Sequence, residues 1–308
     1  MKVYAFDGWQ IDTYGALGAY AFDGSRVDFV AGFRSFANEA RIALGKRVLL
    51  NTVNSYGQVD IANSTVDFVY SELWGGHETF ASILATSDEV HHANPGKALV
   101  LAAYIHRHGP RDGPNPVGSF NTPSVLLTDA AIFASGASHI ELGDGDRMMS
   151  SDYWPDDLRL NISPELRLAL RHYYDYLTGY EAYLGHTESI EFPVTVQSYR
   201  TDPSGSPDAI WTIARTSSNV TMVHLINLLG SADPNWRDVA MTRPVPPILR
   251  DVVVEIPHCS GVMAAGWASP DIDGGLYHRI AIKADVKIGS CSVVVPSLYY
   301  WSTIFLRH

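Results

Sequence analysis

The chain has 308 residues, of which 46% are hydrophobic and 18% charged, and its formal net charge at pH 7 is -11. This is the composition of a globular protein with a well-filled core, in one large domain or two medium ones. No basic run and no apolar stretch of membrane-spanning length occurs, so neither a nucleic acid nor a membrane is expected as a partner. A neutral polymer such as a polysaccharide remains compatible with the negative charge.

Neither the N-terminus nor the cysteines assign the protein to a compartment. The first residues, 1–6, contain no apolar core and no cleavage site of an export signal. Cys259 and Cys291 could pair, but two cysteines are too few to fix the redox environment. The neighbouring histidines His91 and His92 lack a third ligand at usable spacing. We therefore expect no metal and no cofactor.

Upstream of residue 187, short apolar runs alternate with helical patterns. Amphipathic periodicity and capping signals predict helices at residues 26–44, 77–92, 122–135 and 163–184. Apolar runs predict strands at residues 3–6, 48–53, 67–70, 98–105 and 138–142. Because strands in this alternating series are apolar on both faces, they are expected to pair in parallel.

Polar and aromatic residues follow each predicted strand. They occupy residues 7–12, 54–58, 71–74, 104–106 and 141–146. A (β/α)8 barrel collects its active-site residues after every strand, whereas a doubly wound sheet usually binds ligands at one switch point. Residues 1–186 are therefore predicted to belong to a (β/α)8-type barrel.

Residues 187–308 have a different texture, with short alternating apolar runs and turns rich in Gly, Pro and Asp. Such runs lie at residues 209–214, 220–229, 252–256, 277–286, 291–295 and 298–306. Runs at this spacing are typical of an antiparallel β-sandwich. The predicted fold class is therefore α/β plus β, with a barrel followed by a sandwich domain.

The first candidate site lies in residues 6–15. Asp7 and Asp12 stand five residues apart, with Trp9 and Gly8 between them. One carboxylate could brace the loop while the other faces a sugar ring. A capped loop with solvated aspartates is the alternative, because Asp and Gly are ordinary turn residues.

The second candidate is Glu72, which follows the buried strand at 67–70 and lies close to Trp74. Apolar surroundings favour the protonated form of a carboxyl, which a general acid for glycosidic cleavage needs. Glu72 follows Asp12 by two β-α units, so the two carboxylates could face each other across a barrel mouth. Retention of configuration requires them about 5–5.5 Å apart. A helix-capping role for Glu72 is the alternative.

A third acidic cluster follows the strand at 138–142. Glu141, Asp144 and Asp146 could hold sugar hydroxyl groups. A calcium site is the weaker reading, because the EF-hand spacing and its terminal Glu are absent. The aromatic residues Tyr56 and Tyr104, like Trp9 and Trp74, offer flat faces for sugar rings, although Tyr56 and Tyr104 could equally pack at the barrel rim.

Four segments together resemble glycoside hydrolase family 66, the family of bacterial dextranases and cycloisomaltooligosaccharide glucanotransferases. They are residues 7–15, 51–57, 70–74 and 139–146, in the same order as in the family. The resemblance covers nearly the whole chain and is strongest over residues 6–155. It implies that Asp12 is the nucleophile, after barrel strand 4, and that Glu72 is the acid/base residue, after strand 6.

The same resemblance implies that this chain carries barrel strands 4–8 only, followed by the β-domain. Five strands cannot close an eight-stranded barrel, and the open sheet would have two exposed edges. Val48, Leu50, Leu99 and Leu101 are expected to point into the barrel interior and to lack opposing neighbours. The chain alone is then expected to self-associate through those edges and to show little activity.

The resemblance implies a retaining hydrolase that cleaves α-1,6 linkages of dextran-like glucans through a covalent glycosyl-enzyme. Two alternatives stay open: transglycosylation to cyclic isomaltooligosaccharides, which uses the same carboxylates, and a non-catalytic glucan-binding remnant. The expected partner is thus an α-glucan. Members of the family are usually secreted, so an extracellular location is expected although this chain shows no signal peptide.

Overall fold

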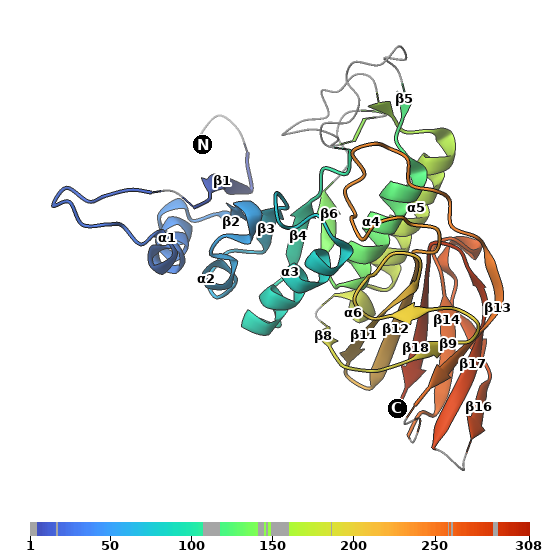
Figure 1. The fold of residues 1–308 in the computed structure, drawn as a ribbon. Coiled ribbons are helices and arrows are strands. Elements are labelled where there is room, and N and C mark those ends of the chain that lie inside the picture. The colour runs from blue at the N-terminus through green and yellow to red at the C-terminus, as the bar shows by residue number, and fades with distance from the viewer. Residues whose placement is uncertain are drawn as a thin grey trace.

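The computed structural model describes residues 5–16, 18–106, 118–140, 145, 147–148, 160–185, 187–257, 259, 261–285 and 289–308. Its first part is a five-stranded sheet in which every neighbouring pair of strands is parallel. In order across the sheet, the strands are β1 (Gly8–Tyr14), β2 (Arg47–Thr52), β3 (Val69–Glu72), β4 (Leu99–Ala102) and β6 (Ser138–Ile140). Within the described residues the sheet is open, with β1 and β6 at its edges (Figure 1).

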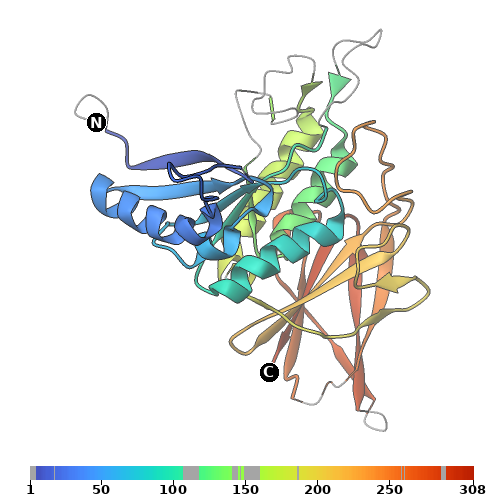
Figure 2. The ribbon, with the colours of Figure 1, turned by 60° about the vertical axis from the view of Figure 1, so that its left-hand side comes forward.

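Helices α1 to α3 lie along one face of this sheet, as Figure 2 shows from a second direction. The helices of this part are α1 (Phe29–Leu44), α2 (Gln58–Ala62), α3 (Phe80–Ala93), α4 (Thr122–Ala134), α5 (Pro164–Gly179) and α6 (Glu181–Leu184). Polar side chains begin four of them by accepting a hydrogen bond from a backbone N–H in the first turn; these are Asp28, Thr79, Asn121 and Ser163. The predicted helices are confirmed to within a few residues, except that α2 was missed and the last predicted helix is divided into α5 and α6.

The first predicted strand is wrong. Its N-terminal part lies outside the described residues, and Phe6 is exposed and in no strand. The observed strand β1 begins at Gly8 and contains polar residues such as Gln10 and Asp12. An edge strand is held by backbone hydrogen bonds to its one neighbour, so it needs no continuous apolar run.

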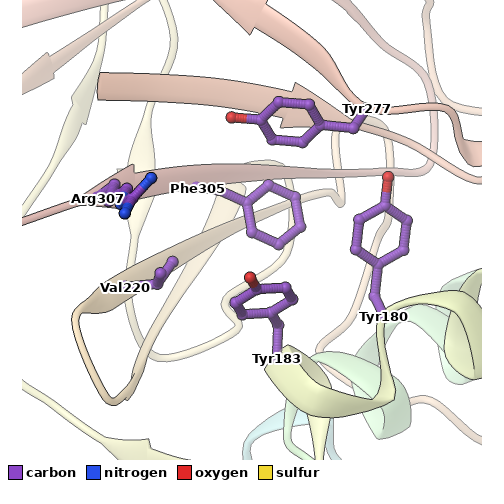
Figure 3. A pocket seen from close by; sticks show the side chains of 6 residues that line it. All are labelled: Tyr180, Tyr183, Val220, Tyr277, Phe305 and Arg307. Carbon is purple, nitrogen blue, oxygen red and sulfur yellow. The ribbon is translucent and has the colours of Figure 1, made fainter. Parts of the chain in front are cut away.

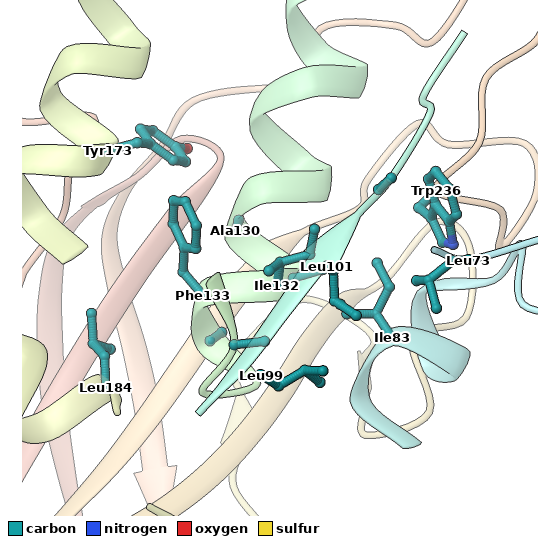
Figure 4. Packing of buried hydrophobic residues seen from close by; sticks show 14 of the residues in the cluster. Leu73, Ile83, Leu99, Leu101, Ala130, Ile132, Phe133, Tyr173, Leu184 and Trp236 are labelled. Atoms are coloured by element: carbon teal, nitrogen blue, oxygen red, sulfur yellow. The ribbon is translucent and has the colours of Figure 1, made fainter. Parts of the chain in front are cut away.

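The predicted orientation of four strand residues is also wrong. Val48, Leu50, Leu99 and Leu101 are at most 1% exposed and belong to the core shared with the helices. Figure 4 shows Leu99 and Leu101 beside Ile83 of α3. The other face of the sheet carries a smaller cluster in which Tyr70, Ala102 and Tyr104 are buried and Leu49, Phe68, Trp74 and Val100 are partly buried. Successive side chains along a strand point to opposite faces of the sheet. The prediction placed these four residues on the face turned away from the helices, whereas they lie on the face that packs against the helices.

The remaining strands form two larger sheets, antiparallel except at the short pair β10–β11. One sheet contains β8 (Glu188–Ser189), β10 (Thr201–Asp202), β11 (Ile210–Ser217), β12 (Val220–Asn227), β14 (Ala264–Ala268), β15 (His278–Ile280) and β18 (Trp301–Arg307). The other contains β9 (Thr195–Val196), β13 (Leu249–Ile256), β16 (Ile282–Asp285) and β17 (Ser290–Leu298). A separate short pair joins β5 (Gly118–Ser119) to β7 (Leu160–Asn161).

The two larger sheets share one apolar cluster. Leu225 and Ile304 come from the first sheet, and Val254 and Val293 come from the second. Cys259, just after β13, forms a disulfide with Cys291 of β17. The pairing that the sequence left open is therefore present.

The sheet that contains β11, β12 and β18 packs its other face against α4 and α5. Residues on that face belong to the same apolar core as the parallel sheet. Trp301 of β18 lies 6.4 Å from Phe133 of α4 and 5.9 Å from Tyr173 of α5, measured between ring centroids. On β11, Arg215 is 1% exposed and donates a hydrogen bond to Asp88 of α3 at 2.9 Å. A buried charge is tolerated only with such partners, so Arg215 fixes the β-strands to the helical layer. None of the described helices is long and apolar enough to cross a membrane.

Candidate active site

Two carboxylates lie at the same end of the parallel sheet. Asp12 is the fifth residue of β1, and Glu72 is the last residue of β3, with β2 between these strands. Because the strands are parallel, their C-terminal ends meet at one edge of the sheet. The prediction that Asp12 and Glu72 lie at the C-terminal ends of the first and third strands is confirmed.

Asp12 is exposed and is held by the neighbouring strand. The side-chain amide of Asn51 on β2 donates a hydrogen bond to Asp12 Oδ1 at 2.9 Å. Asn51 is itself 1% exposed, so its side chain has little freedom to turn away. The amide therefore orients one oxygen of Asp12 and leaves the carboxylate accessible from solvent.

Glu72 has a more enclosed environment, with an exposed fraction of 6%. The hydroxyl of Tyr104, which follows β4, donates a hydrogen bond to Glu72 Oε1 at 2.9 Å. The Trp74 ring stacks on the Tyr104 ring, with centroids 5.0 Å apart and planes 16° from parallel. Tyr104 is 1% exposed, so it acts here as a buried partner of Glu72.

Tyr70 connects the surroundings of the two carboxylates. It pairs with Asn51 in the sheet register and lies two residues before Glu72 on β3. Burial raises the pKa of the Tyr70 phenol, and the negative charges of Glu72 and Asp12 raise it further. Tyr70 therefore stays protonated. Nothing in the sequence pattern distinguished it from an ordinary strand residue.

The turn after β2 supports the same end of the sheet. Asn54 Oδ1 accepts a hydrogen bond from the backbone N–H of Trp74 at 3.0 Å, and its amide donates to the carbonyl of Gly75 at 3.1 Å. Gly57 has a left-handed φ of +69°, and a Cβ there would lie 2.4 Å from the Phe33 ring. The segment 51–57 thus needs its Asn and its Gly for geometry.

A long loop between β12 and β13 also contacts the segments that follow β3 and β4, and the sequence did not point to it. Arg237 donates a hydrogen bond to the carbonyl of Leu73, the residue after Glu72, and to Glu78 Oε1 at 3.2 Å. The backbone N–H of Asp238 donates to the carbonyl of Ile105 at 2.9 Å. This bracing loop, residues 231–243, therefore fixes the segments that follow β3 and β4. Its contacts are more than 100 residues apart in sequence, beyond the reach of local patterns.

His106, which follows β4, has a structural role. One ring nitrogen, Nδ1, lies 2.7 Å from the carbonyl oxygen of Asp238, and the other, Nε2, accepts from the N–H of Asn121 at 3.1 Å. Burial lowers the pKa of the His106 imidazole, so it is neutral at pH 7. This histidine joins the bracing loop to the start of α4.

The remaining predicted site residues are Asp7, Trp9, Tyr56, Glu141, Asp144 and Asp146. Asp7 precedes β1, and Trp9 pairs with Val48 near the beginning of the strands, so neither is brought to the end that carries Asp12 and Glu72. Tyr56 packs edge-on against Phe33 of α1 with ring centroids 5.8 Å apart. Glu141, Asp144 and Asp146 lie outside the described residues.

Three known proteins have sequences or structures similar to this chain. A cycloisomaltooligosaccharide glucanotransferase of Niallia circulans is 32% identical over 199 residues, which are 62% of this chain and 20% of that protein. A dextranase of Streptococcus salivarius is 25% identical over 271 residues, covering 73% of this chain and 33% of that protein. The crystal structure of a Paenibacillus sp. cycloisomaltooligosaccharide glucanotransferase, complexed with cycloisomaltoheptaose, matches with a TM-score of 0.87 at 20% identity.

That structural match covers 97% of this chain and 62% of the Paenibacillus protein, and at this identity it shows a common fold. The chain spans a fifth to a third of the length of the two sequence relatives. A family model, glycosyl hydrolase family 66, matches residues 1–305. This chain is therefore a member of glycosyl hydrolase family 66.

Proposed function

We propose that the protein cleaves α-1,6 linkages in dextran-like glucans with retention of configuration, and that Asp12 and Glu72 are its catalytic residues. The placement of the two acids carries the proposal, because Asp12 on β1 and Glu72 on β3 lie at the same end of the parallel sheet, with β2 between them. Substrate binding is assigned to Trp74 beside the acids. Family membership and the printed activities of the relatives support the class of substrate.

The two carboxylates have different surroundings, which suits two different roles. Asp12 is exposed and oriented by Asn51, as a nucleophile needs, and Glu72 is enclosed, as a general acid needs. An Asp12 oxygen attacks the anomeric carbon while Glu72 gives its proton to the glycosidic oxygen, which leaves with the downstream sugar. The Glu72 carboxylate then takes a proton from water, whose oxygen attacks the anomeric carbon and releases Asp12.

The parallel strands leave the two acids within reach of each other. The backbones of β1 and β3 are two strand spacings apart, about 9–10 Å. Side chains that converge over β2 can bring the carboxylates to the separation of about 5–5.5 Å that retention requires. Phe68 and Val100 on the same face would then belong to the interior of a (β/α)8-type barrel to which residues 1–186 contribute strands 4–8, with residues 187–308 as a β-sandwich domain.

Transfer to a sugar hydroxyl is the second candidate function. Two of the three similar proteins described above are glucanotransferases, which supports it. The same acids would serve, and Glu72 would take its proton from an acceptor sugar in place of water. Products separated by size distinguish the reactions: hydrolysis yields linear oligosaccharides with reducing ends, and intramolecular transfer yields rings without them.

Paired substitutions in the natural protein test the assignment of the acids. Asp12→Asn should abolish turnover of every substrate. Glu72→Gln should slow dextran cleavage far more than cleavage of an α-glucoside with a good leaving group, because only the former leaving group needs protonation. Equal losses on both substrates would reject Glu72 as the acid, and binding of dextran without turnover by the unmodified protein would favour the non-catalytic alternative.

Two further proposals concern the surroundings in which the enzyme works. Because a polymer such as dextran does not cross a cell membrane, we place the enzyme outside the cell. Within the described residues, no strand pairs with the outer edges of β1 and β6, and these edges are expected to promote self-association of residues 1–308 and to lower their activity. Sedimentation velocity at several concentrations measures this association, and a monomer with robust dextranase activity would contradict it.

A further inference from the structure

An aromatic pocket lies where the connection between α5 and α6 meets β12 and β18 of the seven-stranded sheet. Its volume is about 340 Å³, within the usual range for small-molecule sites. It is lined by Tyr180, Tyr183, Val220, Tyr277, Phe305 and Arg307 (Figure 3). Four of these six residues are aromatic, and none is acidic.

Phe305 forms the floor of the pocket, and three tyrosines surround it. Phe305 is 6% exposed, whereas Tyr183 and Tyr277 are 40% and 49% exposed. The ring centroids of Tyr180, Tyr183 and Tyr277 lie 5.3, 5.8 and 5.9 Å from that of Phe305. The rings therefore meet at different angles around one floor, and two of them present surface to solvent.

Two contacts hold Tyr180 and Tyr277 in place. The Tyr180 hydroxyl donates a hydrogen bond to the carbonyl of Gly275 at 2.8 Å. The Tyr277 ring lies directly over the backbone of Gly266 on β14, where a Cβ would come within 2.1 Å of its atoms. Only glycine at position 266 gives this ring its place, so the orientation of Tyr277 is built into the strand below it.

The pocket also offers polar groups that the rest of the described chain does not use. Among the described residues, no hydrogen-bond or ion-pair partner contacts the Tyr183 hydroxyl, the Tyr277 hydroxyl or the Arg307 guanidinium. These three groups border an apolar floor. A ligand that fits must therefore combine an apolar face with several hydroxyl groups around its rim.

We propose that this aromatic pocket is an accessory binding site for the glucosyl units of a neutral α-glucan. One face of a pyranose ring consists of C–H groups, which pack on the negative face of an aromatic ring, and the hydroxyls around the ring edge bond to phenol and guanidinium groups. The proposal rests on the proposed function, because it gives the polymer substrate a second point of attachment on the same chain.

The pocket is separate from the two carboxylates. Glu181 and Leu184 of α6 lie beside Ser138, the first residue of β6, so α6 is at the N-terminal end of the parallel strands, whereas Asp12 and Glu72 are at their C-terminal end. Figure 1 shows α6 at the end of α5 away from β5. An oligosaccharide of a few units cannot reach both places, whereas a long dextran can. A second attachment point raises the effective concentration of polymer at the catalytic end without a new contact there.

Binding of isomaltoheptaose and retardation in dextran-containing gels test the proposal in the natural protein carrying Asp12→Asn, which leaves the glucan uncleaved. The double variant Tyr183→Ala/Tyr277→Ala should weaken binding to dextran about tenfold, which corresponds to about 1.4 kcal/mol, because it removes both exposed rings. Gly266→Ala should weaken it as well by displacing the Tyr277 ring. Tyr199→Ala is the matched control, because Tyr199 is 38% exposed and lies outside the pocket.

The outcomes separate this proposal from the proposed function. In the protein with Asp12 restored, the pocket variants should cleave a short aryl isomaltoside at the unmodified rate. If dextran binding is the same in the double variant as in Tyr199→Ala, the accessory site is rejected even when catalysis is normal. If inorganic phosphate binds and Arg307→Gln abolishes that binding, while the pocket variants leave dextran binding unchanged, the pocket is an anion site and the proposal is overturned. If the unmodified protein has no glycosidase activity, but the tyrosine variants still lose dextran binding, only the proposed function is rejected.

Discussion

The hydroxyl of Tyr104 donates a hydrogen bond to Glu72 across two neighbouring parallel strands, at 2.9 Å. Both side chains are buried, and the Trp74 ring stacked on Tyr104 prevents the phenol from turning away. The Glu72 side chain is thereby held in one direction. Without the hydrogen bond, this flexible side chain at the end of a strand would sample several rotamers. A proton donor must be held in this way to act on one oxygen of a bound substrate.

Tyr104→Phe removes this hydrogen bond and keeps the stacked ring. We expect kcat/KM for dextran to fall severalfold, up to about tenfold, because a hydrogen bond between neutral groups contributes about 0.5–1.5 kcal/mol. Steady-state kinetics and the melting temperature measure the two effects separately. Tyr20→Phe, at a tyrosine 73% exposed in the loop after β1, is the control. Unchanged kinetics in Tyr104→Phe would show that the bond does not orient Glu72 during turnover.

Arg237→Met keeps the apolar stem of the side chain and removes the guanidinium that bonds to the Leu73 carbonyl and Glu78. The Arg237 side chain is 7% exposed and Leu73 is fully buried, so the substitution removes this donor from an enclosed carbonyl. We expect the free energy of unfolding to fall by about 1–3 kcal/mol, and kcat to fall while KM changes little. Denaturant titration and kinetics measure these values.

Arg200→Met is the matched control for Arg237. Arg200 pairs with Asp202 on the surface, where its side chain is 58% exposed. An exposed pair contributes only about 0–1 kcal/mol, so this variant should be close to the unmodified protein. Loss of stability in Arg237→Met with no change in kcat would show that the bracing loop stabilises the fold without positioning Glu72.

Much of the secondary structure was predictable because it rests on local signals. The helix at 122–134 begins with the N-cap Asn121 and with Pro123 in its first turn, and both signals are visible in the sequence. Strand β1 was misplaced because Gln10 and Asp12 make it polar. The strand phase was also misassigned, since Leu49 and Leu50 are both apolar and only one of them faces the helices.

The candidate site was predictable in part. Asp12 and Glu72 were identified because each follows a predicted strand and belongs to a motif. Tyr70, Asn51 as the partner of Asp12, and Arg237 became visible only when strands and loops distant in sequence were brought together. The roles of these residues depend on contacts that no periodicity or spacing reports.

Asp271 should give stability a specific dependence on pH. Burial raises the pKa of its carboxyl to about 6, although the backbone N–H groups of Tyr300 and Trp301 and the Tyr173 hydroxyl donate to it. A folded-state pKa above the unfolded value of 3.8 means that the folded protein binds the extra proton. The contribution of Asp271 to stability is therefore fully present below about pH 4 and is lost as the pH rises to about 6.

Asp271→Asn removes this titration. The free energy of unfolding of the unmodified protein, minus that of the variant, should fall by about 2 kcal/mol between pH 4 and pH 6. Urea denaturation at several pH values measures the difference. A difference that stays constant over this range would show that Asp271 titrates at an ordinary pKa.

The most direct test of the catalytic assignment is to trap the glycosyl-enzyme. The natural protein carrying Glu72→Gln is incubated with a 5-fluoro-α-isomaltosyl fluoride, whose good leaving group needs no protonation and whose second fluorine slows release. Mass spectrometry of the digested protein should then find the sugar attached to the peptide that contains Asp12, and no adduct when Asp12→Asn is added. A sugar attached to another residue, or rapid turnover that survives Asp12→Asn, would contradict the account.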